Sequence, residues 1–364
     1  MKVFRCQNCG QLVYFENTYC ERCGYKLGYL SDHFTLSALT PAGDGFWYAL
    51  ANPGQPYRYC ANADYRACNW LVPEESPNLL CQCCHLNRII PNLGQPGNRL
   101  LWVKLERAKH RLVYSLLNLG LPVVSKADDP ETGLAFDFLA MRKSEFREDA
   151  AVVTGHSKGL ITINLAEADD AERERQRLTM TEPYRTLLGH MRHEIGHYYW
   201  DRLVSKSSEL SAFREQFGDE RKDYSQALEK HYQEGPPTDW PTQFVSAYAS
   251  THPWEDWAET WAHYLHIVDT LETAYAFGLR LQPASTGEDS AAININFDPY
   301  HHDNFEILVE AWLPLTYAVN SLNRSMGQPD LYPFVLAPAV LNKLRFIHKI
   351  ISQRPRLPGF CPPM

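Results

Sequence analysis

The sequence predicts an α+β protein with two domains, in which a small cysteine-rich module precedes a mainly helical domain with a small sheet. Its 364 residues exceed the length of one ordinary domain, and 45% hydrophobic with 21% charged residues are typical of a folded protein. Most of the ten cysteines precede residue 95, whereas apolar residues at helical spacing begin near residue 99. We therefore expect one domain over residues 1–95 and another over residues 99–352.

The composition and the net charge of the chain indicate its cell compartment and argue against two classes of partner. No apolar run reaches the roughly 18 residues of a membrane span, and the start "MKVFRCQNCG" lacks the apolar core of a signal peptide. We expect a cytoplasmic protein without a membrane partner. The net charge is −8, and residues 1–98 carry seven basic and seven acidic side chains, so we expect no nucleic-acid partner.

Four cysteines at the N-terminus have the spacing of a zinc site. They are Cys6, Cys9, Cys20 and Cys23, in the pairs "CQNC" and "CERC". In a reducing compartment metal binding is the common use of such pairs, and two pairs supply the four thiolates of a tetrahedral zinc ion. Gly10 and Gly24 follow the two pairs and suit the positive φ of such turns. We predict a structural zinc ion here.

A second cysteine set has a looser spacing. It comprises Cys60, Cys68, Cys81 and Cys84. Cys83 is an alternative to Cys84, and His85 is an alternative to either, so the fourth ligand stays open. Residues 1–95 contain few long apolar periodic runs, and we expect bound zinc to supply much of the stability of this module.

Helical periodicity then begins with "NRLLWVKLERAKHRLVYSLLNLG", where Gly120 is placed to end the helix. We expect its basic residues to form a solvated face: Lys104, Arg107, Lys109 and Arg111. The alternation in "GLITINLAEAD" predicts a strand from Leu160 to Leu165, and "AERERQRL" predicts a further helix. "GPPTDWP" (235–241) reads as a connection and "QPASTGEDSAA" (282–292) as an exposed loop.

The next predicted helix, "EPYRTLLGHMRHEIGHYYWDRL", opens at Glu182-Pro183 and carries a possible metal site. His193 and His197 are one turn apart and point the same way, so both imidazoles can reach one ion. Glu194 lies beside them, where a general base is needed. Gly196 costs about 1 kcal/mol of helix propensity, which we explain by a closely packed neighbouring element.

The helix "HPWEDWAETWAHYLHIVDT" (252–270) offers the missing third ligand, with Pro253 in its first turn. One stripe combines two acids and two small residues, followed by a histidine: Glu255, Ala258, Glu259, Ala262 and His266. The alanines let this helix approach the histidine helix, and a metal compensates the carboxylates, which are costly to bury alone.

With these motifs, and with "YRYC", "CNWLVP" and "LNRSMGQPDLYPFVL", nearly the whole chain resembles a family of bacterial zinc-binding metallopeptidases with an N-terminal zinc ribbon. The histidine helix with a distal glutamate is similar to the gluzincin arrangement. The resemblance implies a zincin-like peptidase domain with zinc held by His193, His197 and Glu255. The same pattern implies that Glu259 orients a ligand histidine, while the alternative frame makes Glu259 the ligand with Ala262 and His263 behind it.

The expected reaction is peptide-bond hydrolysis of a peptide or protein substrate by a zinc-activated water, with Glu194 as general base. Together with the two cysteine sites, this predicts about three zinc ions per chain. The oxyanion donor stays open among His263, Tyr264, His266, Tyr232, His301 and His302. The strand 160–165 either pairs with substrate or lies inside a sheet.

Two other function classes fit parts of the pattern. In the first, the chain is an adaptor whose zinc-ribbon module binds a protein partner beside an inactive peptidase fold. In the second, it is a transcription-type zinc ribbon with a regulatory domain, which the balanced charge of residues 1–98 disfavours.

Overall fold

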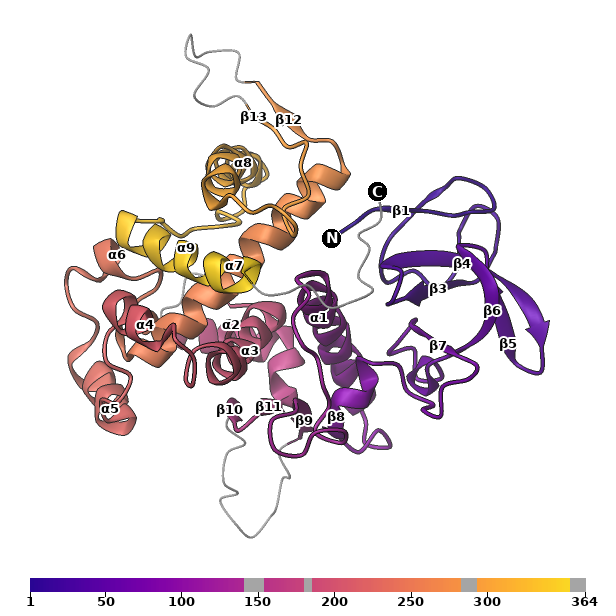
Figure 1. Cartoon of the computed structure of the whole chain (residues 1–364), viewed down its shortest axis with the longest axis horizontal. Helices are drawn as coiled ribbons and strands as arrows, with labels where there is room; N and C mark the ends of the chain where they lie inside the picture. Colours follow the sequence, from indigo (N-terminus) through magenta and orange to yellow (C-terminus); the bar gives the residue numbers. More distant parts are fainter. Residues whose placement is uncertain (141–153, 180–184, 283–292, 354–364) are drawn as a thin grey trace. The chain divides into compact units, whose positions relative to one another are not determined.

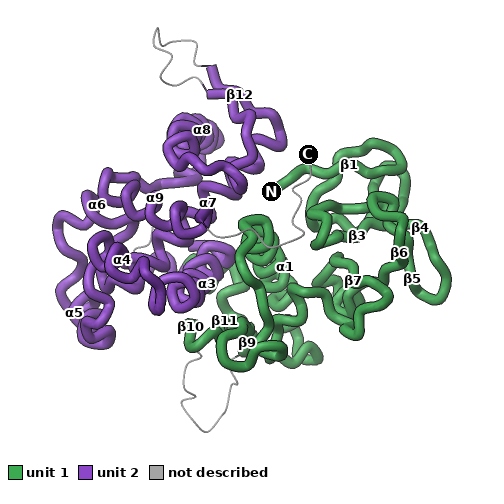
Figure 2. Tube along the Cα trace, viewed as in Figure 1, with its two compact units in different colours: residues 1–174, 356–364 green, residues 175–355 purple. Residues whose placement is uncertain are grey.

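The computed structural model describes residues 1–140, 154–179, 185–282 and 293–353, and the chain forms two compact units (Figure 1). Figure 2 shows unit 1, with the described residues up to 174, and unit 2, with those from 175 to 353. Helices and sheets are both present, so the predicted α+β class is confirmed. The predicted domain boundary at residues 95–99 lies inside unit 1, and the division into domains 1–95 and 99–352 stays a prediction. Among the described helices, none has the length and apolar character needed to cross a membrane.

Unit 1 begins with two turns that hold the first four cysteines. Strand β1 (Phe4–Arg5) pairs with β2 (Leu12–Val13) in antiparallel fashion, and Cys6 and Cys9 lie between them. A bridge between Tyr19 and Lys26 closes the second turn, which contains the other cysteine pair.

A five-stranded antiparallel sheet follows in the order β3-β4-β5-β6-β7. Its strands are β3 (Leu27–Leu30), β4 (Thr35–Gly43), β5 (Phe46–Ala49), β6 (Asn52–Tyr59) and β7 (Leu71–Pro73). A bridge between Tyr29 and Trp70 brings the residue before β7 back to β3. The sheet has an apolar core of its own, formed by Leu30, Leu39, Ala49, Tyr57 and Leu71. Burial of this cluster stabilises the module in addition to any bound metal.

Helix α1 (Asn98–Asn118) packs on aromatic residues of the cysteine-rich module within unit 1. The ring of Tyr114 lies 5.5 Å from that of Phe15, and the ring of His110 lies 5.2 Å from that of Trp70. The helix ends at Asn118, and Gly120 follows with a φ of 66°, as the sequence predicted.

The predicted solvated basic face of α1 is wrong at one position. Lys104, Arg107 and Arg111 are exposed, but Lys109 is fully buried. Its ammonium group lies 3.0 Å from the carboxylate of Glu106, which is buried on the same helix. A lysine is tolerated inside a protein when an opposite charge pairs with it, and sequence spacing alone did not show this pairing.

The second sheet of unit 1 has the order β10-β11-β9-β8. Its strands are β8 (Asn87–Ile89), β9 (Ala135–Leu139), β10 (Gly155–Ser157) and β11 (Leu160–Asn164). Strand β11 confirms the predicted strand, and it pairs with β9 on one side and β10 on the other. Both of its hydrogen-bonding edges are used, so it is an internal strand and offers no edge to a substrate. The predicted helix "AERERQRL" is confirmed as α2 (Asp170–Thr179).

Unit 2 is built around α3 (Leu187–Leu203) and α7 (Pro253–Ala276), which pack side by side (Figure 1). The other helices are α4 (Leu210–Phe217), α5 (Tyr224–Glu234), α6 (Trp240–Gln243), α8 (Phe305–Ser325) and α9 (Pro338–Ser352). Strand β12 (Arg280–Leu281) pairs with β13 (Ile293–Asn294) in antiparallel fashion, and most of the predicted loop 282–292 lies outside the described residues.

The central helices begin at identifiable caps. Helix α7 starts at Pro253 as predicted, and the side chain of His252 accepts a hydrogen bond from the backbone N–H of Trp254. Helix α3 starts later than predicted, because Thr186 caps it by accepting a hydrogen bond from the N–H of Gly189. The predicted opening at Glu182-Pro183 lies outside the described residues.

Ion pairs connect α7 to its neighbours. Arg192 of α3 lies 2.5 Å from Asp269 in the second half of α7, and Lys343 of α9 lies 2.7 Å from the buried Asp256 near its start. These ion pairs join two positions of α7, Asp256 and Asp269, to the neighbouring helices.

Candidate metal centres

The two histidines of the HExxH pattern lie on the face of α3 that packs on α7. His193 and His197 are 7% and 4% exposed, and their ring centroids are 4.9 Å apart. Residues four apart in a helix project in the same direction, which accounts for this pairing.

Gly196 allows α3 and α7 to approach closely, as the sequence predicted. A Cβ at Gly196 would lie 3.0 Å from the Cα of Ala258 and 3.2 Å from the Cβ of Trp261. The indole N–H of Trp257 donates to the carbonyl of Gly196 over 2.9 Å. A side chain at residue 196 would require the facing atoms of α7 to shift by a few tenths of an ångström.

Glu255 reaches across this contact to both histidines. Its Oε2 lies 3.0 Å from Nε2 of His193 and 3.5 Å from Nε2 of His197. Its other oxygen, Oε1, accepts a hydrogen bond of 2.8 Å from the hydroxyl of Tyr224 on α5. We call His193, His197 and Glu255 the histidine–glutamate cluster.

Glu259 lies behind His193. Its Oε1 is 2.7 Å from Nδ1 of His193, and its Oε2 accepts a 2.6 Å hydrogen bond from the hydroxyl of Ser246. Because the carboxylate of Glu259 can only accept, Nδ1 of His193 carries the proton of this hydrogen bond. In a neutral ring Nε2 then has a free lone pair, and this nitrogen faces Glu255. The structure therefore separates the two acids of α7 into different positions around the same histidine.

The donor atoms of the cluster fit a zinc ion. Three ligand atoms, one from each residue, lie within 4.8 Å of one another. Tetrahedral bonds of about 2.0–2.2 Å put ligand atoms about 3.3–3.6 Å apart, close to the observed distances. Oε2 of Glu255 is buried and makes no hydrogen bond of good geometry among the described residues. Burial lowers the pKa of His193, but the carboxylates of Glu255 and Glu259 hold this pKa well above its ordinary value, which indicates an anionic environment suited to a cation.

Glu194 is buried beside the cluster and contacts His190. Its Oε1 lies 3.2 Å from Nε2 of His190, one helical turn earlier. Burial raises the pKa of Glu194, but the hydrogen bond from His190 and the nearby ring of His193 hold it below its usual value. The group is therefore kept as a carboxylate, the form that accepts a proton.

Sequence reasoning missed two tyrosines next to the cluster. Tyr224 hydrogen-bonds Glu255, and the ring of Tyr248, in the 3-10 helix η4 (Tyr248–Ser250), lies 6.0 Å from that of His193. Burial raises the pKa of both hydroxyls, and the nearby carboxylate of Glu255 raises it further. Neither tyrosine belongs to a sequence motif. They lie on α5 and η4, which reach the site only when the chain is folded.

The six side chains suggested for the oxyanion role have other surroundings. Three of them lie on α7 and have partners of their own: His263 contacts Tyr332, Tyr264 contacts His348, and His266 contacts Arg192. Near the start of α8, His301 contacts Asp298 and His302 contacts the Asn304 carbonyl. Tyr232 is 63% exposed. Burial lowers the pKa of His263 to about 4, which keeps this ring neutral at pH 7.

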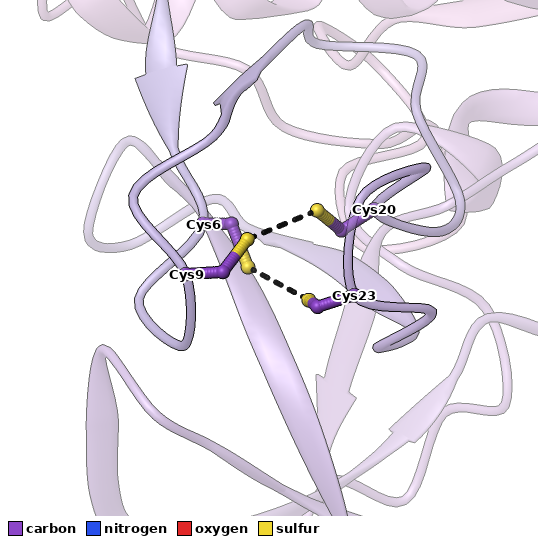
Figure 3. Close-up of side chains that lie close together, drawn as sticks. All are labelled: Cys6, Cys9, Cys20 and Cys23. Carbon is purple, nitrogen blue, oxygen red and sulfur yellow. Dashed lines mark hydrogen bonds between the residues drawn. The ribbon is translucent and has the colours of Figure 1, made fainter.

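The first cysteine cluster comprises Cys6, Cys9, Cys20 and Cys23, which face one another in Figure 3. The Sγ atoms are 3.7 Å apart between Cys6 and Cys23, and 3.6 Å apart between Cys9 and Cys20. Zinc–sulfur bonds of about 2.3 Å in a tetrahedron put sulfurs about 3.8 Å apart, so the spacing fits zinc. Gly10 and Gly24 have φ of 71° and 75°, the positive values that the sequence predicted.

The second cysteine cluster comprises Cys60, Cys68, Cys81 and Cys84, all buried. Hydrogen bonds from the other three thiols hold the pKa of Cys60 far below its usual range, whereas burial raises the pKa of Cys68 well above it. Only a cation at the centre would favour four thiolates in this space. The two alternative ligands lie outside the group, since Cys83 is not a member and His85 lies 3.3 Å from Asp128.

Comparisons with known proteins agree with both kinds of site. The family model described as "Putative zinc-binding metallo-peptidase" matches residues 98–350, and one described as "zinc-ribbon domain" matches residues 3–95. Three relatives, uncharacterized proteins of Mycobacterium bovis and Mycobacterium tuberculosis, are each 45% identical over 354 residues, with 97% of this chain and 96% of theirs covered. The comparison with solved structures found no match.

Proposed function

The chain belongs to the zinc-binding metallo-peptidase family and has an N-terminal zinc-ribbon domain, and from this premise we propose that it hydrolyses peptide bonds in unit 2. The family supports a peptidase activity in general, as the resemblance predicted. In our proposal, the histidine–glutamate cluster holds the catalytic zinc ion. Glu194 is the general base.

Convergence of three buried donor atoms supports this proposal most strongly. Two imidazole nitrogens and one carboxylate oxygen face a common point, and three protein ligands leave a fourth zinc position for water or substrate. A zinc ion held there would lower the pKa of a bound water and polarise the scissile carbonyl.

Glu194 is suited to proton transfer next to this point. It follows His193 directly in the helix, and its carboxylate is buried and ionised. In the proposed reaction it takes a proton from the attacking water and passes it to the nitrogen of the leaving amine. The contact with His190 restrains the carboxylate, so that one oxygen can face the water.

The surrounding side chains hold the ligands in place. Glu259 accepts the N–H of His193 and is itself held by Ser246, an arrangement that fixes the ring and raises the basicity of its other nitrogen. Tyr224 fixes Glu255 in the same way. We add Tyr248 as a candidate donor to the tetrahedral oxyanion, because its ring lies 6.0 Å from that of His193 and its raised pKa keeps the hydroxyl protonated.

Replacement of Glu194 by glutamine tests the proposal. The purified full-length protein is incubated with a mixed peptide library, with and without a chelator, and products are identified by mass spectrometry. We expect chelator-sensitive cleavage in the wild type and a loss of at least about 100-fold in Glu194→Gln, since a general base contributes roughly that factor or more. Zinc content should be unchanged, because Glu194 is not a ligand.

Glu229→Gln is the matched control, with the same change of charge at an exposed position of α5. It should cleave like the wild type. Zinc bound at the cluster without cleavage of any library peptide would instead favour the adaptor hypothesis, in which the zinc-ribbon module binds a protein partner. Equal cleavage by the wild type and Glu194→Gln would exclude Glu194 as the base.

A further inference from the structure

Three polar side chains of α1 are buried against the second cysteine cluster. Glu106 and Lys109 are fully buried, and His110 is 4% exposed. All three lie within unit 1, but the family models divide them from the cysteines, because the zinc-ribbon match ends at residue 95 and the peptidase match begins at residue 98.

His110 directs one ring nitrogen at two sulfur atoms of the cluster. Its Nε2 lies 3.2 Å from Sγ of Cys68 and 3.7 Å from Sγ of Cys84. Its Nδ1 is 2.7 Å from the backbone carbonyl of Glu106, and a carbonyl only accepts, so Nδ1 carries a proton. The edge-to-face contact with Trp70 holds the ring in this orientation.

Cys84, Glu106 and His110 lie close enough to one another to bind a further metal ion. The charges around them disfavour such a site. The ammonium group of Lys109 lies 3.1 Å from Oε1 and 3.0 Å from Oε2 of Glu106, and the amide of Asn87 donates to Oε1 over 2.7 Å. A divalent ion bound by Glu106 would be repelled by this ammonium group.

The charge balance of the cluster favours a donor at Nε2. Four thiolates around zinc keep a net negative charge, and Oε2 of Glu106 adds another anion 3.8 Å from Sγ of Cys84. Lys109 neutralises Glu106, which leaves the thiolates in need of positive charge in a buried place. His110 is placed to supply this donor, because Nδ1 is engaged by the Glu106 carbonyl and Nε2 faces both sulfurs.

We propose that His110 donates its Nε2–H to the thiolates of Cys68 and Cys84 when these hold zinc, as a positioning residue outside a four-sulfur site. One metal centre is then completed by side chains from both family matches, so the zinc-ribbon module and α1 act as one structural element. The proposal concerns the second cysteine cluster alone and does not depend on peptidase activity.

The wild-type protein, loaded with an NMR-active cadmium isotope and with histidine labelled at its ring nitrogens, tests the coordination directly. Cadmium in the second cluster should couple to the Hβ protons of four cysteines, and Nε2 of His110 should keep its proton. Direct one-bond coupling between this nitrogen and cadmium would make His110 a ligand and overturn the proposal. No variant has to fold for this measurement.

Substitutions of His110 test the energetic role, with zinc affinity measured by chelator competition. His110→Ala should weaken one zinc site by about 10- to 100-fold, the usual cost of losing a hydrogen bond to a ligand. His110→Gln should recover part of the affinity, because its amide N–H can still donate. His85→Ala is the control, since His85 adjoins Cys84 but pairs with Asp128. Unchanged affinity in a folded His110→Ala protein, or equal losses in His110→Ala and His85→Ala, would overturn the proposal.

Discussion

The second cysteine cluster and the histidine–glutamate cluster are both buried, but they differ in backbone and in donors. The cysteines come from loops and from one short helix, η2 (Cys84–Leu86), whereas the donors of unit 2 come from the long helices α3 and α7. Four thiolates complete a tetrahedron, whereas two imidazoles and a carboxylate leave one position open. This difference is the basis of our proposal that the site in unit 1 stabilises the fold and that the site in unit 2 is catalytic.

The two backbones should also depend on metal to different degrees. Helices satisfy their own hydrogen bonds, and buried tryptophans and ion pairs hold α3 and α7, so we expect the histidine–glutamate cluster to keep its geometry when zinc is removed. The cysteines of unit 1 lie in loops and short turns, and metal binding contributes directly to folding in modules of this kind.

The largest expected effect is the loss of the second cysteine cluster. Cys60→Ser should lower the zinc content from about three to about two ions per chain. It should also lower the free energy of unfolding of unit 1 by several kcal/mol. Structural zinc contributes about 10–16 kcal/mol in zinc-finger peptides, but the loss should be smaller here because the five-stranded sheet retains a core of its own. Elemental analysis and thermal unfolding followed by circular dichroism measure both quantities.

Two further variants sharpen this result. Cys83→Ser changes a buried thiol outside the four-sulfur group, and its zinc content should stay at the wild-type value. His197→Ala should lose one zinc ion with a much smaller loss of stability. If His197→Ala destabilised the protein as much as Cys60→Ser, the distinction between a structural and a reactive site would fail.

A smaller effect is expected from the two acids of α7. Glu255→Gln should remove the zinc of unit 2 or weaken it by more than about 100-fold, whereas Glu259→Gln should weaken it by about 10- to 100-fold, the range for a residue that orients a ligand. The two acids differ in position. Oε2 of Glu255 faces Nε2 of both His193 and His197, whereas Glu259 contacts Nδ1 of His193, on the far side of the ring. Zinc competition assays on both variants measure the ratio. The assignment is wrong if Glu259→Gln loses the ion and Glu255→Gln keeps it.

The sequence predicted the parts of the fold and site that depend on local spacing. Helix α7 begins at Pro253 and helix α1 ends just before Gly120, because proline and glycine act on the backbone at their own positions. The histidines, both acids of α7 and the small residues between the helices also follow helical periodicity. The geometry brings them together, although their catalytic roles stay predictions.

The parts that were missed depend on contacts between distant segments. The five-stranded sheet was not predicted, since segments such as "NPGQPYRY" of β6 contain proline and glycine and resemble a loop. Lys109 belongs to a run of basic residues, a pattern that predicts an exposed helix face. Its burial depends on the ion pair with Glu106, which the pattern does not reveal. Tyr224 and Tyr248 carry no motif, so no single-sequence pattern could place them beside Glu255.

The smallest expected effect concerns Gly196, where helix propensity and packing act in opposite directions. Gly196→Ala gains about 1 kcal/mol of helix propensity, but the new Cβ would lie 3.0 Å from the backbone of Ala258, and overpacking a core costs about 1–3 kcal/mol. We expect a net loss of roughly 1 kcal/mol. The affinity for the zinc of unit 2 should also weaken, because α3 must move away from α7 and from Glu255. Both cysteine clusters should keep their affinity, since they lie in the other unit.

Gly155→Ala is the control, because a Cβ at Gly155 meets no atom within 4 Å. Chemical denaturation and zinc competition on both variants separate the alternatives. A Gly196→Ala protein that is more stable than the wild type, with unchanged zinc affinity, would mean that α3 has room to move. The close approach of the helices would then not be what positions Glu255. If stability and the zinc affinity of unit 2 fall together while the cysteine clusters are unaffected, the reactive site depends on helix packing, in contrast to the metal-dependent cluster of unit 1.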